Sequence, residues 1–410
     1  MTSTVKIPEW WIETTLGQLV KVWRWSSPRP IQDYVQNFPW IPWVKIADAT
    51  SSNSRFITET WEFIKEEWRS TTVYPWDLIV SNSATPWIPK FMQIEACVHD
   101  WRLVFSDYKN IEKDYLYYFF LNYRRILEHQ ATWTVFKNLK TDIVRNLEII
   151  IPQNPQEQKA IAGVLSVFDD KIELLRAENQ TLEEMGQTLF KEWFGKYKVG
   201  DELPDGWKEY ELSELVDTIN WYSYKGNELV EKSSEALVTL KSFDRNWWFQ
   251  TRWFKEFKWN PKSEQEVFVW DLVVAHTDLT QDAEVLGNPA FIVNNWWFER
   301  LYITMDLVKV NSKNENITKS FLYFLMRTKE FKWHCVWYSN WTTVLHLSKK
   351  AIPEYKIVLP KDLSWLKEKS LAFELIMKKI SHNFSQIDEL IKTRDQLLPK
   401  LMSWKVRVKF

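Results

Sequence analysis

The sequence predicts an α+β fold built as a pseudo-twofold duplication, with two similar domains and two long helices that pair antiparallel as a coiled coil. Three observations support this fold class. Segments of the first half recur in the second half, each half ends in a heptad-spaced helix, and strands and helices mix without regular βαβ alternation. Two like domains joined by long helices suit a protein that reads two separated sites.

The internal repeat consists of short matched segments. Ile7-Pro8-Glu9-Trp10-Trp11 returns as Leu203-Pro204-Asp205-Gly206-Trp207, and Trp76-Asp77-Leu78-Ile79-Val80 returns as Trp270-Asp271-Leu272-Val273-Val274. Thr132-Trp133-Thr134 returns as Asn340-Trp341-Thr342. Because the order of the segments is the same in both halves, we interpret them as the framework of one domain present twice.

Residues 1–152 form the first predicted domain. Its expected strands are Val44–Ile46, Leu78–Val80 and Leu147–Ile151, and its expected helix is Asp114–Glu128. Residues 201–360 repeat this domain.

Residues 153–200 contain the first long helix. Asn154 is a good N-cap, Pro155 fits the first helical position, and Glu157 stands where a capping box places its acid. Apolar residues then follow a period of 3.5, which predicts a left-handed coiled coil with Asn179 as a polar seam position that sets register. The predicted seam is Ile161, Leu165, Phe168, Ile172, Leu175, Asn179, Leu182 and Leu189.

Residues 361–410 contain the second long helix, which we expect from Ser364, a possible N-cap, to Leu401. Its predicted seam includes Met377, Ile380, Phe384, Ile387, Ile391, Leu398 and Leu401, with Arg394 as a polar exception. The two apolar stripes are most simply buried against each other. The alternative is that each helix packs separately against its own domain.

Composition places few limits on partners. The net charge of −1 neither supports nor excludes a nucleic-acid partner. Cys97 and Cys335 are far apart and indicate a reducing compartment without a disulfide framework. No apolar signal-peptide region and no long apolar run is present, so we expect a cytoplasmic protein without a membrane partner.

The tryptophan content is abnormal. The chain has 27 Trp and only 8 Gly, whereas a chain of this length usually has about 29 Gly. Many Trp stand where turns want Gly, and Trp10 is opposite Gly206 in the repeat. Our hypothesis is that most are glycines encoded by UGA in a lineage that reads this codon as Gly. We expect Trp11, Trp43, Trp193 and Trp207, which have apolar or repeat-matched neighbours, to be genuine.

Signals for catalysis are poor. His99-Asp100 resembles an acid–base pair, but no nucleophile or metal cluster accompanies it, so we interpret it as a surface pair. Asn154-Pro155-Gln156-Glu157 is better explained as a helix cap than as a base-flipping motif. The His and Cys residues have no metal-ligand spacing, and no phosphate-binding Gly-Lys-Ser/Thr loop occurs. We therefore expect no metal, no cofactor and no catalytic residue in this chain.

Signals for binding are better. Basic residues recur beside hydroxyl and amide side chains at matched places in both halves, a combination that suits contacts to DNA phosphates and base edges. Ordinary solvated charge is the alternative for any single cluster. The DNA-binding candidates are Arg24, Ser26, Ser27, Arg29, Thr132, Thr134, Lys137, Lys140, Arg145, Arg245, Arg252, Lys255, Lys258, Asn340, Thr342, Thr343, His346, Lys349 and Lys350.

Together these motifs resemble the specificity (S) subunit of type I restriction–modification systems. The resemblance covers nearly the whole chain and includes the doubled opening, the doubled Trp-Asp-Leu strand, Asn154 to Ala162, Leu189 to Phe194, and Leu397 to Ser403. The departures are mainly Trp residues where the family usually has Gly, such as Trp10, Trp76, Trp133, Trp270, Trp341 and Trp404.

The resemblance implies two target-recognition domains that each read half of a bipartite, asymmetric site in double-stranded DNA. It implies that the helices act as a ruler and dock two methyltransferase (M) subunits, with restriction (R) subunits joining for cleavage. S-adenosylmethionine, ATP and Mg would belong to those partners, so this chain would be non-catalytic. Two readings remain as alternatives: a stand-alone or fused DNA-modifying enzyme, and a coiled-coil adaptor without a DNA role.

Overall fold

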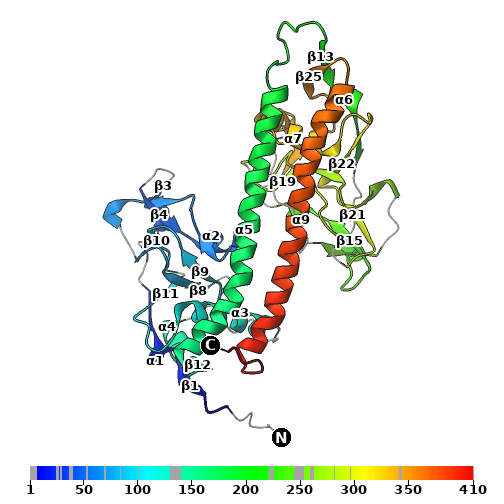
Figure 1. Ribbon diagram of the computed structural model, residues 1–410. Coiled ribbons are helices and arrows are strands. Elements are labelled where there is room, and N and C mark those ends of the chain that lie inside the picture. Colours follow the sequence, from blue (N-terminus) through cyan, green and yellow to red (C-terminus); the bar gives the residue numbers. More distant parts are fainter. Residues whose placement is uncertain are drawn as a thin grey trace. The chain divides into compact units, whose positions relative to one another are not determined.

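The structure is a computed structural model of the 410-residue chain (Figure 1). It describes residues 7–24, 27, 30–36, 40–51, 54–68, 71–83, 85–100, 102–129, 140–220, 226–243, 254–258, 263–280, 282–295, 297–340 and 344–409. The chain divides into two compact units. Unit 1 comprises Met1–Leu174 and Ile387–Phe410, and unit 2 comprises Leu175–Gln386.

The described residues of unit 1 form three sheets. An antiparallel pair joins β1 (Trp11–Thr15) to β12 (Glu148–Pro152). One five-stranded sheet has the order β3-β6-β4-β10-β7, and the other has the order β2-β11-β8-β9-β5. Their strands are β2 Lys21–Trp23, β3 Val35–Gln36, β4 Ile41–Val44, β5 Phe56–Ile57, β6 Phe63–Ile64, β7 Thr72–Val73, β8 Leu78–Ser81, β9 Pro89–Met92, β10 Ala96–Val98 and β11 Arg102–Ser106.

Unit 1 also contains helices that lie wholly within it, of which α3 is the longest. They are α1 Leu16–Leu19, α2 Ile46–Ser51, α3 Lys113–His129 and α4 Thr141–Arg145, with single 3-10 turns at Ile31–Asp33 and Glu66–Trp68. The expected strand at Val44–Ile46 is wrong at its end, because the strand stops at Val44 and Ile46 begins α2. The core lies between α3 and the sheet that contains β8 and β11.

In its described residues, unit 2 also has an antiparallel pair and two larger sheets, and it has in addition a three-stranded sheet. β13 (Trp207–Glu211) pairs with β25 (Lys356–Pro360), and three further sheets have the orders β14-β22-β18-β20, β16-β15-β21-β17 and β19-β24-β23. Their strands are β14 Val216–Asn220, β15 Glu235–Val238, β16 Lys255–Glu256, β17 Glu266–Val267, β18 Leu272–Ala275, β19 Thr277–Asp278, β20 Pro289–Phe291, β21 Arg300–Ile303, β22 Leu307–Ser312, β23 Ser339–Asn340 and β24 Leu345–Leu347. Its shorter helices are α6 Leu212–Leu215, α7 Lys319–Met326 and α8 Lys329–Trp337, with 3-10 turns at Gly226–Glu228, Leu240–Ser242 and Ser263–Gln265.

Two long helices each contribute one end to unit 1 and the other end to unit 2. They are α5 (Pro155–Phe194) and α9 (Ser364–Leu401) (Figure 1). The side chain of Asn154 accepts a hydrogen bond from Gln156 N at 2.9 Å, so it caps α5 as predicted. At α9 the side-chain acceptor is Asp362, which bonds Ser364 N at 3.0 Å. The predicted bounds of this helix, Ser364 to Leu401, are confirmed, but Ser364 is its first helical residue and not its N-cap.

Within unit 1, the two helix ends pack antiparallel around an ionic contact. Arg394 Nη1 lies 2.5 Å from Asp169 Oδ1, and Tyr118 of α3 donates to the other oxygen of Asp169 at 2.7 Å. This group ties α3, α5 and α9 together in unit 1. The predicted seam residues of unit 1 are buried at Ile161, Leu165, Ile172, Ile387, Leu398 and Leu401, and half-buried at Phe168 and Ile391.

Within unit 2, an amide pair takes the corresponding place. Asn383 Nδ2 donates to Asn179 Oδ1 at 2.8 Å, and both side chains are buried. Asn179 is therefore on the seam, and its partner Asn383 was missed from the sequence. The other predicted seam residues of unit 2 are buried at Leu175, Met377 and Ile380, and half-buried at Leu182, Leu189 and Phe384.

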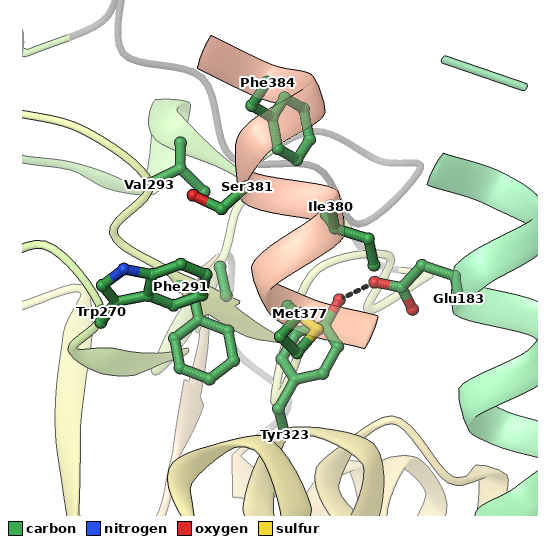
Figure 2. Close-up of a pocket in the computed structure, with 10 residues that line it drawn as sticks. Glu183, Trp270, Phe291, Val293, Tyr323, Met377, Ile380, Ser381 and Phe384 are labelled. Carbon is green, nitrogen blue, oxygen red and sulfur yellow. Dashed lines mark hydrogen bonds between the residues drawn. The ribbon is translucent and has the colours of Figure 1, made fainter. Parts of the chain in front are cut away.

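Helix α7 anchors the sheets of unit 2 to the same helix pair. Figure 2 shows the Tyr323 hydroxyl donating to Glu183 of α5 beside Met377 and Ile380 of α9. Burial raises the pKa of Glu183, and Arg327 lies 3.4 Å from its second carboxylate oxygen. Gly186 is required one turn further along α5, because a Cβ there would lie 2.2 Å from the Phe324 ring.

Several tryptophans have backbone conformations that favour glycine. Trp76 (φ 72°), Trp270 (φ 76°), Trp87 (φ 67°) and Trp404 (φ 51°) lie in the left-handed region. Trp87 stands two residues before Pro89, and Gly287 (φ 75°) stands two residues before the matched Pro289. Gly at Trp87 would therefore match the other unit. Trp10 does not share this feature. Its repeat partner Gly206 has φ 91°, whereas Trp10 is not among the residues with positive φ.

Three tryptophans expected to be genuine pack against other side chains in the interior or at its edge. Trp43 and Trp11 are 0% and 4% exposed, and Trp193 packs edge-on against Phe373. Among the described residues, none of the helices combines the length and the hydropathy of a bilayer-spanning segment.

Candidate nucleic-acid interface

Each unit has polar residues at an equivalent sheet edge. They come directly after the strand that is repeated in the sequence, β8 in unit 1 and β18 in unit 2. In unit 1, β8 pairs Arg102 with Ser81, and Asn82 follows. In unit 2, β18 pairs Leu307 with Ala275, and His276 follows. The register makes these positions equivalent, because Val80 faces Pro89 just as Val274 faces Pro289.

The edge of unit 1 is charged and mostly buried. Arg102 is 1% exposed, its Nη2 donates to Lys45 O at 2.5 Å, and burial lowers its pKa to about 10 despite the nearby Asp48 carboxylate. His99 Nδ1 lies 2.7 Å from Asp100 Oδ1, with side chains only 13% and 16% exposed. The expectation of a surface His99-Asp100 pair is therefore wrong.

The edge of unit 2 consists of small polar groups and histidine. Asp306 accepts from the hydroxyls of Thr277 at 2.9 Å and Thr304 at 3.4 Å. Burial lowers the pKa of His276 to about 4, and the nearby His346 and Lys349 contribute to this effect. The same edge therefore carries different chemistry in the two units.

A loop held by several hydrogen bonds follows this edge in unit 2. Asp278 accepts hydrogen bonds from the amides of Thr280, Val285 and Leu286, and Lys332 of α8 donates to Leu286 O at 2.6 Å. Burial lowers the pKa of Lys332 to about 8. Gly287 closes the loop, since a Cβ there would lie 2.7 Å from Cys335. One signal in the sequence could have indicated this edge, namely the polar residues directly after each repeated strand.

The DNA-binding candidates of unit 1 divide into exposed and internally bonded residues. Arg24 and Lys140 are exposed. Ser27 is 7% exposed, and its hydroxyl accepts from Asp100 N at 2.9 Å. Arg145 donates to Val22 O at 2.8 Å, which holds α4 against β2 near Arg24. Candidates of this unit that lie outside the described residues are Ser26, Arg29, Thr132, Thr134 and Lys137.

In unit 2, Asn340 and His346 are brought together as direct partners on β23 and β24. Lys349 and Lys350 follow β24 and are exposed. Lys255 and Lys258 belong to a different sheet edge, at β16 and just after it. Candidates of this unit that lie outside the described residues are Arg245, Arg252, Thr342 and Thr343.

Comparisons with known proteins agree with the resemblance seen in the sequence. The MjaIX specificity subunit of a type I restriction enzyme from Methanocaldococcus jannaschii is 26% identical, over 99% of this chain and 96% of that protein. The MjaVIII specificity subunit of the same organism is 22% identical, over 99% and 95%.

A solved S subunit of a type I restriction–modification system from M. genitalium matches with a TM-score of 0.53 at 15% identity, over 98% of both chains. That likeness shows a shared mixed α and β fold. Residues 8–184 match the family described as Type I restriction modification DNA specificity domain. The resemblance to type I specificity subunits is thereby confirmed, by the family match over residues 8–184 and by relatives that align over almost the whole chain.

Proposed function

We propose that this chain is the DNA sequence-recognition subunit of a type I restriction–modification complex. The observation that supports it most is the shared strand register of the two units combined with different polar residues at the matched edge. A shared strand framework with different polar side chains in each unit suits the recognition of two different half-sites. The specificity subunit is a non-catalytic member of such a complex, so methylation and cleavage belong to partner subunits.

The finer organisation follows from the resemblance and is part of this proposal. Residues 1–152 and 201–360 are two target-recognition domains, and residues 153–200 and 361–410 supply two antiparallel spacer helices. Each domain reads one half of a bipartite, asymmetric DNA site. Two modest half-site affinities held by a stiff spacer combine through effective concentration.

We further propose that two methyltransferase subunits dock on the spacer helices, with restriction subunits joining for cleavage. Exposed apolar residues on the helices support this. Val167 and Leu174 of α5 are seven residues apart and 65% and 59% exposed, and Leu371 and Leu375 of α9 are 54% and 67% exposed. These spacings place each pair on one helix face, where a partner helix would cover it. S-adenosylmethionine, ATP and Mg would be bound by the partners.

Methylation mapping tests the proposal. The chain is combined with its methyltransferase subunits, and methylated positions are mapped by single-molecule sequencing of genomic DNA. We expect one bipartite, asymmetric motif with a fixed unread spacer, and no methylation by the chain alone. Methylation by the purified chain would instead indicate a DNA-modifying enzyme. A complex that binds random duplexes without sequence preference would indicate an adaptor without a DNA role.

A further inference from the structure

Unit 2 has a surface groove of about 420 Å³ between the end of α8 and strands β23 and β24. Its lining contains Asn340 and His346, two of the residues selected from the sequence. The lining residues are Trp337, Tyr338, Ser339, Asn340, His346, Leu347 and Ser348. Polar side chains from three consecutive elements thus meet at one open surface.

The hydrogen bonds of Asn340 restrict what it can recognise. Its Oδ1 accepts from His346 N at 2.9 Å, so the side-chain amino group is the end that remains for a ligand. Reading adenine through an asparagine uses both the oxygen and the amino group, so here the oxygen would have to accept from the base and from His346 N together. Donation from the amino group to a single acceptor requires no such sharing.

The remaining groups of the groove are also donors. Ser348 Oγ accepts from Lys350 N at 3.3 Å and keeps its own proton to donate. The His346 ring carries at least one N–H in every protonation state. The hydroxyls of Ser339 and Tyr338 are used internally, since they donate to Val336 O at 2.7 Å and to Glu354 Oε2 at 2.8 Å.

The side chains of two lysines place positive charge beside the groove. Lys349 and Lys350 follow β24 directly, and both are exposed. The Glu354 carboxylate already accepts a hydrogen bond from Tyr338, and its Oε1 lies 3.6 Å from Lys350 Nζ. This ion pair is weak, because the lysine side chain is 75% exposed. Donors next to cations are the usual surroundings of a DNA phosphate, whereas base edges present both donors and acceptors.

We propose that this groove is a phosphate-contact site that holds the DNA backbone against unit 2 and reads no base. The proposal rests on the proposed DNA-recognition function and assigns one task within it. Asn340, His346 and Ser348 donate to phosphate oxygens, and Lys349 and Lys350 supply charge. None of the proposed donors or cations is a tryptophan, although Trp337 contributes to the lining of the groove.

The test uses the full chain in complex with its methyltransferase subunits. Asn340→Asp keeps an oxygen for His346 N but replaces the amino donor with negative charge. We expect the affinity for duplex DNA to fall about tenfold or more, equally for the methylated motif and for unrelated sequence, with an unchanged motif. Lys350→Gln, at an exposed site where folding is not at risk, should reduce the salt dependence by about one phosphate contact.

Asn227→Asp is the matched control, because Asn227 is an exposed asparagine of the same unit that does not line the groove. If Asn340→Asp loses no more affinity than this control, or Lys350→Gln leaves the salt slope unchanged, the phosphate assignment is overturned. A motif that relaxes at one base pair, with unrelated sequence bound as before, also overturns it in favour of base reading. A parent complex that recognises no bipartite motif would count against the proposed function and not against this site.

Discussion

Unit 1 and unit 2 share a framework that extends to the pairing of single residues. Trp11 faces Pro152 in one unit, and Trp207 faces Pro360 in the other. A parallel pair also lies at the corresponding place in each unit, β4 with β10 and β15 with β21, and unit 1 has a further parallel pair, β5 with β9. The shared parts are strands with buried apolar side chains, so core packing explains why they stay alike.

The units differ where the framework ends. Arg102 of unit 1 corresponds to Leu307 of unit 2, and Asn82 corresponds to His276. Arg102 and Leu307 begin β11 and β22, whereas Asn82 and His276 follow β8 and β18. All four side chains are at most 5% exposed, so the two units bury different groups at equivalent positions. The comparison shows that one strand framework holds different side chains at equivalent positions in the two units.

The largest expected effect comes from charging the helix seam in either unit. Ile172 in unit 1 and Ile380 in unit 2 are each 2% exposed, so an aspartate there buries an unpaired carboxylate. We expect Ile172→Asp and Ile380→Asp each to cost about 4 kcal/mol or more of unfolding free energy, measured by calorimetry. Val167→Asp, on the exposed face of α5, is the control and should change stability by about 0.5 kcal/mol or less. Equal effects at Ile172 and Val167 would contradict a buried seam.

Exchanging the edge residues between the units should lower the free energy of unfolding by unequal amounts. Leu307→Arg places a cation in an apolar site that is 0% exposed, and we expect a cost of about 3–5 kcal/mol. Arg102→Leu removes the donor to Lys45 O and the cation near Asp48, and we expect about 1–3 kcal/mol. Chemical denaturation of both variants measures the difference. Two equal and small losses would show that the edges are interchangeable.

Acid should destabilise unit 2 through His276. Its folded pKa is about 4 and its unfolded pKa is about 6.5, so below pH 6.5 the unfolded state binds the proton more readily. Stability is therefore lost as the pH falls from about 6.5 through about 4, by about 2–3 kcal/mol in total. His276→Asn, which introduces the residue of unit 1, should remove this part of the pH dependence in urea denaturation at pH 7 and 4.5. An unchanged pH dependence would contradict the burial of His276.

The smallest effect concerns the tryptophans. Trp76 is 57% exposed with φ 72°, so Trp76→Gly relieves strain and loses little burial. We expect about 1 kcal/mol of added stability, whereas Trp76→Ala, which keeps a Cβ, should gain none. Trp270→Gly should gain less, because Trp270 also packs edge-on against Phe291.

The intact mass of the native protein tests the recoding hypothesis directly. We expect the native mass to be lower than that of the printed sequence. At each recoded position the indolylmethyl side chain of Trp is replaced by the hydrogen atom of Gly. A native mass that matches the printed sequence would refute the hypothesis.

The sequence predicted the parts of the fold that depend on periodicity. The seam positions of α5 and α9 and the cap at Asn154 could be read because helix spacing and capping are local rules. The sheet edge after β8 and β18 could not be predicted in the same way. Arg102 and Ser81 become neighbours only through β11 and β8, and Asn383 reaches Asn179 only when the helices pair. Such contacts join residues far apart in the chain, and no local pattern announces them.

The spacer claim is tested most directly by shortening both long helices by one heptad. Residues 172–178 and 384–390 are removed together, which keeps the Asp169–Arg394 contact in unit 1 and the Asn179–Asn383 contact in unit 2. Each helix becomes about 10.5 Å shorter, or about 3 base pairs of B-DNA. We predict that the methylated motif keeps both half-sites and loses about 3 base pairs from its unread spacer. An unchanged spacer in an active complex would contradict the account.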